Sequence, residues 1–174
     1  MRRRLSFLGM CFLIGCTAST GAPSTDCAMS MPVSGVITTT LTGAGCGSST
    51  GGDTMLNFMS GDFLGGGEIT TANIDLGSAL AGGQTGTFAS SDVEITESGA
   101  DAGDVSWQTP ASACTVTITS NVSSPDPSGV FKNRYVIDGN GTCSQPAVAP
   151  ATQTQGGSIS ISPFTFHGFI DPAS

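Results

Sequence analysis

The side chains with the most definite chemistry in this sequence are cysteines. Cys27, Cys46, Cys114 and Cys143 follow the apolar start of the chain, and no two of them lie closer than nineteen residues. Zinc sites use close pairs such as C-x-x-C, so metal ligation is not expected. In an exported chain four cysteines form two disulfides, for which three connectivities exist. We predict the pairs Cys27–Cys46 and Cys114–Cys143, because each pair flanks one probable hairpin.

The single histidine, His167, is the first candidate for acid–base chemistry. It lies in the segment Phe166-His167-Gly168-Phe169. Side chains alternate along a strand, so an inward-facing Phe166 places His167 on the opposite face. A Ser-His-Asp triad also needs a nucleophile in a recognisable turn, and the sequence contains no G-x-S-x-G. We therefore expect His167 to be a surface strand residue and predict no catalytic residue.

Carboxylates gather in one short stretch between residues 92 and 104. Its members are Asp92, Glu94, Glu97, Asp101 and Asp104. Hard cations collect oxygen ligands from loops, so a calcium site is the specific hypothesis, but the spacing matches no EF-hand loop. A solvated acidic face is the interpretation that we favour.

A second calcium-like pattern begins at Asp138-Gly139-Asn140-Gly141, but it lacks the third ligand position and the distal Glu. A hairpin turn explains it more simply. Sugar-cleaving sites pair carboxylates with several aromatic platforms, whereas this chain has one Trp, Trp107, and one Tyr, Tyr135. We expect Trp107 to fill the core. No phosphate-binding glycine loop is present, and we expect no cofactor and no metal.

The amino terminus has the layout of a signal peptide. Arg2, Arg3 and Arg4 precede an apolar run over residues 5–14, which ends in Leu13-Ile14-Gly15-Cys16. A helix of ten residues rises only about 15 Å, half of a hydrocarbon core, so a permanent transmembrane anchor is disfavoured. The four-residue ending resembles the lipobox of bacterial lipoproteins. The resemblance implies cleavage before Cys16 and a diacylglyceryl group on its sulfur; an ordinary secretory signal cut near Ala18 or Ala22 is the alternative.

The resemblance also implies a location. In enteric-type sorting an Asp directly after the lipidated cysteine retains the protein in the inner membrane, and here that position is Thr17. A cell-envelope protein anchored by lipid in the outer membrane is therefore expected. Residues 1–15 form the signal peptide, residues 16–26 the lipidated Cys16 and a short flexible tether, and residues 27–174 the folded domain.

Charge restricts the partners of the processed chain. Removing residues 1–15 leaves Lys132 and Arg134 against 13 carboxylates, a net charge of −11. Binding to phosphates depends on clustered Lys and Arg, so nucleic acid is not expected as a partner. The membrane, through the anchor at Cys16, and an envelope protein or polymer are the partners that remain.

Composition and alternation predict an all-β domain. Thr, Ser and Gly dominate, and no segment of twelve residues has an apolar period of 3.6. We expect an antiparallel two-sheet β-sandwich of about eight short strands, stapled by disulfides. Bulges are expected at Gly139 and Gly141, and a loop from Asn121 to Gly129. The expected strands cover residues 33–41, 55–59, 68–76, 88–96, a short piece at Val105 and Trp107, 113–120, 130–143 and 158–170.

The mature part, with its stretches Cys-Thr-Val-Thr-Ile-Thr and Gly-Thr-Cys-Ser-Gln-Pro, resembles uncharacterised β-rich lipoproteins of Gram-negative envelopes. That similarity implies no activity. The leading hypothesis is a non-catalytic binding or structural module of the envelope. A calcium- or carbohydrate-binding module that uses Trp107, Tyr135 and the acidic segment 92–104 is the alternative, and a hydrolase is the third.

Overall fold

The computed structural model describes residues 27–43, 45–50, 52–61, 68–99, 104–124, 133–153 and 156–171. All regular structure in these residues is β-strand, and none of them belongs to a helix that could cross a membrane. The strands are β1 (Ala28–Gly35), β2 (Thr39–Leu41), β3 (Gly45–Thr50), β4 (Thr54–Gly61), β5 (Ile69–Asp75), β6 (Gly86–Ser98), β7 (Val105–Gln108), β8 (Cys114–Ser123), β9 (Tyr135–Cys143), β10 (Ala147–Val148), β11 (Ser158–Ile161) and β12 (Phe164–Ile170).

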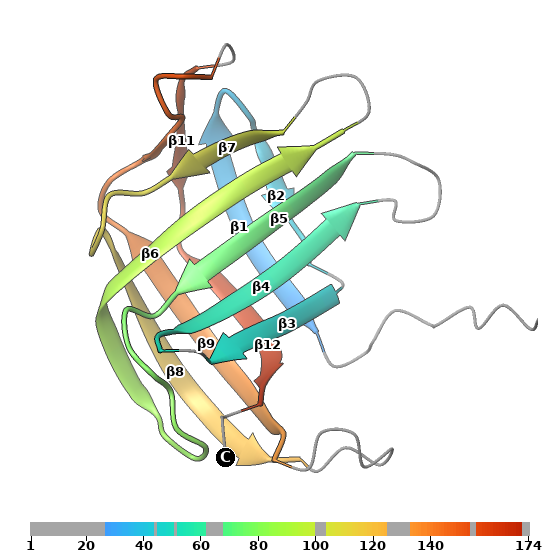
Figure 1. The fold of residues 1–174 in the computed structure, drawn as a ribbon, viewed down its shortest axis with the longest axis vertical. Helices are drawn as coiled ribbons and strands as arrows, with labels where there is room; N and C mark the ends of the chain where they lie inside the picture. The colour runs from blue at the N-terminus through green and yellow to red at the C-terminus, as the bar shows by residue number, and fades with distance from the viewer. Residues whose placement is uncertain are drawn as a thin grey trace, which may run out of the picture.

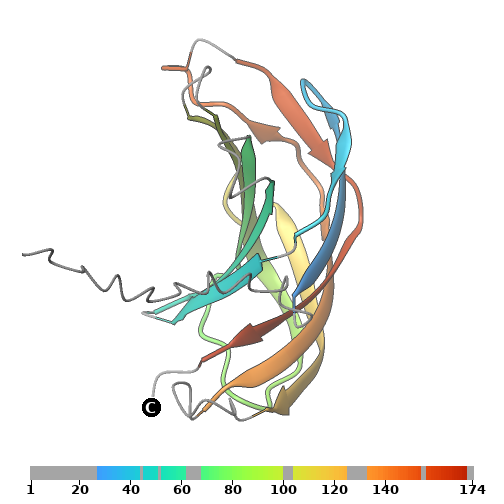
Figure 2. The same cartoon turned by 90° about the vertical axis from the view of Figure 1, so that its right-hand side faces the viewer.

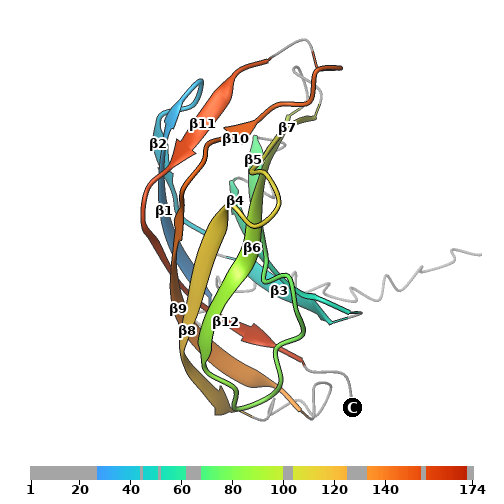
Figure 3. The same cartoon turned by 90° about the vertical axis from the view of Figure 1, so that its left-hand side faces the viewer.

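These strands form one continuous antiparallel sheet of 12 strands in the order β3-β4-β5-β6-β7-β10-β11-β1-β12-β9-β8, with β2 paired to β1. The sheet curls, so that β3 to β7 form a front layer over β1, β12, β9 and β8 behind (Figure 1). The views from the two sides show the layers facing each other (Figures 2 and 3). The all-β antiparallel class is as predicted, whereas the expected count of about eight strands in two separate sheets differs from this arrangement.

Strand β6 keeps the two layers in one sheet, because it pairs with strands of both. Its first half pairs with β8 in the back layer, and its second half pairs with β5 and β7 in the front layer. The register with β8 shifts between Phe88 and Ser91, and the Ser91 hydroxyl donates to the Phe88 carbonyl at 3.0 Å. Such an irregularity bends a strand, so one long strand serves both layers.

Alternation along the strands builds the core. In β8 the inward side chains are Cys114, Val116 and Ile118, all at most 1% exposed. Pro163 separates β11 from β12 and shifts the alternation, so that Ile159 and Ile161 and then Phe164 and Phe166 all face inward. Aromatic contact joins the layers, because the Phe58 ring of β4 lies 5.7 Å from the Phe166 ring of β12.

The prediction of bulges at Gly139 and Gly141 is wrong. The irregularity is on the neighbouring strand β8, between Ile118 and Ser120. The two glycines instead lie directly opposite Phe166 and Phe164, and a Cβ added at either would come within 2.3 Å of the facing ring. They provide the space in which the two rings lie flat against the sheet. Aromatic rings packed over glycine in this way also restore the contacts that a glycine strand lacks.

The structure contains the two predicted disulfides, Cys27–Cys46 and Cys114–Cys143. Cys114 and Cys143 are directly opposite on β8 and β9, as expected for a hairpin. Cys27 and Cys46 flank the hairpin of β1 and β2, as expected, but Cys46 itself lies on β3, which pairs with β4. This second disulfide joins the start of β1 in the back layer to the edge strand β3 of the front layer, so it ties the curled sheet together.

Strand β8 extends beyond its predicted end. Asn121, expected in a loop, is 7% exposed within the strand. Its side-chain amide donates to the carbonyls of Ala81 and Gln84 at 2.9 and 2.8 Å. It thereby holds the connection between β5 and β6, whose Leu80 is buried in the core. A tertiary role of this kind gives Asn121 no local sequence signature.

Candidate functional site

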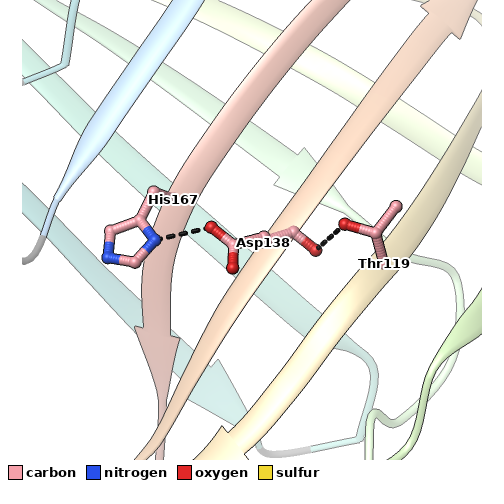
Figure 4. A network of polar contacts seen from close by, with 3 residues as sticks. All are labelled: Thr119, Asp138 and His167. Carbon is pink, nitrogen blue, oxygen red and sulfur yellow. Dashed lines mark hydrogen bonds and ion pairs between the residues drawn. The ribbon is translucent and has the colours of Figure 1, made fainter.

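Two rows of polar side chains cross the outer face of the back layer. The first row contains His167 of β12 and Asp138 of β9, which are directly opposite each other. Their atoms Nδ1 and Oδ1 lie 2.6 Å apart, and the imidazole and carboxylate point toward each other (Figure 4). Beyond Asp138, the Thr119 hydroxyl of β8 donates to the Asp138 carbonyl oxygen at 3.1 Å. Thr119 is at the register shift of β8, so the irregular strand provides this contact.

The bond to Asp138 orients the His167 imidazole and decides which of its nitrogens can meet a ligand. An ionised carboxylate only accepts hydrogen bonds, so Nδ1 carries the proton and Nε2 is the nitrogen left for a ligand. The side chains of His167 and Asp138 are 38% and 48% exposed, so both are reached by solvent. In the described part of the chain Nε2 has no hydroxyl bonded to it. A Ser-His-Asp relay requires that bond, so the described residues supply the His–Asp part of such an arrangement and no hydroxyl bonded to Nε2.

The second row lies two residues along each strand. Ser30 of β1 faces Thr165 of β12, and Thr165 faces Asn140 of β9. All three residues are exposed. Within the described residues their side chains make no hydrogen bond. Hydroxyl and amide groups both donate and accept, so this row offers hydrogen-bonding capacity that the described residues do not use.

A shallow depression of about 460 Å³ runs between the two rows, and we call it the furrow. Its floor is the backbone at Met29, Phe166 and Gly139, because the side chains of the first two residues point into the core and the third has none. It crosses the four strands β1, β12, β9 and β8. Neighbouring strands are about 4.8 Å apart, so the furrow is roughly 14 Å long. Among its lining residues the only ionisable side chains are Asp138 and His167.

The sequence predicted His167 on the outer face of a strand, and it lies there. The predicted hairpin turn at residues 138–141 is wrong, because these residues lie inside β9. Sequence reasoning therefore missed the His167–Asp138 pair and Asn140 as its neighbour. Residues 29 positions apart are joined here by strand pairing, and a strand register of this kind is not readable from one sequence.

The two aromatic candidates lie away from the furrow. Trp107 is 3% exposed, so it fills the core as predicted and presents no platform to a ligand. Tyr135 is half-buried, and its ring covers Gly82, where a Cβ would come within 2.3 Å of it. On the back layer's outer face, the Phe169 ring has the Arg134 guanidinium carbon 3.8 Å from its centroid, so one side of that ring is covered.

The acidic segment divides between the outer face of the front layer and its edge. Asp92 lies opposite Asp75, and Glu94 lies opposite Asn73. Burial raises the pKa of Asp92, and the nearby Asp75 and Glu94 raise it further, while a hydrogen bond with Gln108 opposes them. Burial, followed by Glu68, likewise raises the pKa of Glu97.

Glu97 is still part of β6, although a loop was expected there. Asp104 directly precedes β7, and Asp101 lies outside the described residues. Within the described ranges no three His, Cys, Asp or Glu side chains are grouped so as to hold a metal ion. Cys16, with the predicted signal peptide and tether, also lies outside the described residues.

A scan against protein-family models and searches of curated proteins and of solved structures found no match to this chain.

Proposed function

We propose that this chain is a lipid-anchored lipoprotein of the cell envelope whose domain acts as a non-catalytic binding or structural module. The observation that carries the proposal is the pair of disulfides. Disulfides persist in oxidising compartments outside the cytosol and are rare within it. They support the export signal indicated by the three arginines, the apolar run and the lipobox-like ending at Cys16.

The proposed anchor also suits the placement of the first disulfide. The tether between Cys16 and Cys27 has ten residues, for which a flexible coil spans roughly 15–20 Å on average. Any force on the tether reaches the domain at Cys27, which is covalently bonded to Cys46 on β3. The domain would thus be held close to the bilayer. The disulfide at Cys27 would keep a pull on the tether from separating β1 from the sheet before the rest of the domain.

We further propose that the module works as a sandwich-like body with two polar outer faces, of which the back one is the ligand-binding face. Support for a non-catalytic role comes from His167, whose Nδ1 is bonded to Asp138 while its Nε2 has no nucleophile bonded to it in the described part of the chain. Trp107 is buried, so a carbohydrate ligand on this face would bind without it.

Lipidation is tested by metabolic labelling of the wild-type chain and of Cys16→Ala with a fatty acid. The wild-type protein should carry the label in the membrane fraction, and Cys16→Ala should carry none, because the sulfur that accepts the lipid is missing. Cys11→Ala is the matched control, since this cysteine lies inside the expected signal peptide and should leave labelling unchanged. Label retained by Cys16→Ala would refute the lipoprotein proposal.

Sorting is tested separately with Thr17→Asp. If the enteric-type rule operates, this substitution moves the protein from the outer-membrane to the inner-membrane fraction on a density gradient, whereas Thr17→Ser leaves it in place. Wild-type protein found in the inner membrane would contradict the proposed location without affecting the anchor.

A further inference from the structure

We propose that the furrow binds a neutral, hydroxyl-rich glycan chain that lies across the four strands β1, β12, β9 and β8. The inference deepens the proposed function, on which it rests for the presence of such a polymer around the protein. Its structural basis is the arrangement of the two polar rows on either side of a backbone floor.

The shape of the furrow favours an extended ligand. Its long direction runs across the strands for roughly 14 Å, since strand spacing is about 4.8 Å. The floor carries no side chain that would block a flat ring, because Met29 and Phe166 point inward and residue 139 is glycine. Several linked sugar rings fit along such a path, whereas a compact ligand would use only part of it.

The chemistry of the rims matches sugar hydroxyl groups. Ser30, Thr165 and Asn140 form one rim, and their side chains make no hydrogen bond with other described residues, so binding at these side chains breaks no bond within the described part of the chain. On the other rim, the Asp138 carboxylate uses Oδ1 for His167 and keeps its second oxygen for a ligand. Hydroxyl groups donate to a carboxylate and to Nε2 of a neutral imidazole, and they accept from an amide.

Charge selects among glycans. The furrow contains no Lys or Arg, and the full chain carries a net charge of −8. Anionic polymers are therefore repelled, since their binding depends on clustered basic groups. Strongly basic ligands find one carboxylate among the furrow's lining residues, that of Asp138, and no cluster of acidic groups. A neutral polymer is the class that remains.

Hydrogen bonding without an aromatic platform makes a single furrow a weak site. Of the aromatic side chains nearby, Phe166 faces the core and Phe169 is covered on one side by Arg134. Weak sites become effective when many copies hold one polymer, because each further contact is then intramolecular. Copies held together on a membrane surface and a repeating ligand provide this condition.

His167 allows a direct test, because it is the only histidine in the chain. The lipidated protein, cleaved before Cys16, is labelled with carbon-13 histidine, purified in detergent and titrated with cellohexaose while the imidazole C–H signals are followed by NMR. We expect the signals to shift and saturate with cellohexaose. The anionic galacturonic acid hexamer, at the same concentrations, should leave them in place.

The rim residues supply variants that do not touch His167. Asn140→Ala and Thr165→Ala should each weaken cellohexaose binding about fivefold, the effect of about 1 kcal/mol per lost hydrogen bond. Thr71→Ala, on the outer face of β5 in the other layer, is the matched control and should bind as the wild type. The fluorescence of the buried Trp107 reports whether each variant is folded.

The outcomes are separable from those of the lipidation test. Histidine signals that respond equally to both hexamers, or to neither, would overturn the furrow proposal even if Cys16 is lipidated. Signals that respond to an unfolded casein peptide and not to cellohexaose would assign the furrow to a protein partner and also overturn it. If the wild-type chain binds cellohexaose but metabolic labelling shows that it carries no lipid, the proposal of glycan binding in the furrow is supported and the proposal of a lipid anchor is refuted.

Discussion

The two outer faces of this molecule are both polar, but their side chains are used differently. On the front layer, the side-chain amide of Asn57 donates to the side-chain oxygen Oδ1 of Asn73, and the side-chain amide of Asn73 donates to the Glu94 carboxylate at 3.3 Å. Three neighbouring strands are thus joined by a ladder of side chains that satisfy one another. On the back layer, Asn140 and Thr165 make no such bond with the described residues. Polarity alone therefore does not distinguish the two faces, whereas side-chain hydrogen-bonding groups that the described residues leave unused beside a depression support our proposal of a binding face on the back layer.

The largest expected effect comes from the disulfide that joins the two layers. Replacing Cys27 and Cys46 by Ala together should lower the free energy of unfolding by about 3 kcal/mol, since a loop of about 20 residues is no longer closed in the unfolded chain. Hydrogen exchange should show the loss of protection concentrated in β3 and β4, because β3 is an edge strand. The furrow strands should keep their protection.

Removal of Cys114 and Cys143 is the comparison for that experiment. It should cost a similar free energy, but the loss of protection should fall on β8 and β9, which form one end of the furrow. If both double variants lose protection uniformly, the two layers unfold as one unit, and the faces cannot be treated as separate regions.

The next effect concerns the floor of the furrow. Gly139→Ala should destabilise the protein by about 2 kcal/mol, because overpacking a filled core costs roughly 1–3 kcal/mol and the new Cβ would lie 2.3 Å from the Phe166 ring. Gly47→Ala is the control, since nothing lies within 4 Å of its added Cβ. Thermal or denaturant unfolding provides the measurement. A Gly139→Ala variant as stable as Gly47→Ala would show that the ring does not need the glycine.

The sequence predicted the all-β antiparallel class and both disulfides, because alternation and cysteine spacing are local patterns. It did not predict β3, because the Gly, Ser and Thr residues of this strand are typical of a turn. Its place in the sheet becomes clear only with the disulfide that joins its Cys46 to Cys27 at the start of β1. It also did not predict the continuous sheet, because this depends on how β6 bends between two sets of partners. The furrow was missed for the same reason, since its rows exist only once the registers of four strands are known.

A matched pair of asparagines sharpens the comparison of the faces. Asn73→Ala should cost about 1 kcal/mol, because it removes two side-chain hydrogen bonds from the partly buried ladder. Asn140→Ala should change stability by less than about 0.5 kcal/mol, as is usual for an exposed side chain without such contacts. The change in strand propensity is the same for both, so denaturant unfolding isolates the ladder. If the two substitutions lower the free energy of unfolding equally, the side-chain ladder adds nothing to stability, and the two outer faces do not differ in how their polar side chains contribute.

The smallest effect concerns the acidic side of the front layer and its response to pH. Burial raises the pKa of Asp92 above its ordinary 3.8, and Asp75 and Glu94 add to the rise. The folded state therefore holds this proton more tightly than the unfolded state, so the contribution of Asp92 to stability is greatest below pH 3.8 and is lost as the pH rises through the folded pKa. Asp92→Asn should flatten that decline and raise stability at neutral pH, by less than about 0.5 kcal/mol because the group is largely solvated.

Asp75→Asn separates the two causes of this pH dependence. It removes one repelling charge but leaves Asp92 as buried as before, so it should reduce the decline only in part. Added salt should act in the same direction as Asp75→Asn, since salt screens repulsion between charges but does not restore hydration to a buried group. Unfolding curves of the wild type, Asp92→Asn and Asp75→Asn, collected from acid to neutral pH with and without added salt, measure these effects. If Asp92→Asn instead lowers stability at neutral pH, then the bond from Gln108 outweighs both burial and repulsion, and this carboxylate belongs to the ladder as a stabilising member.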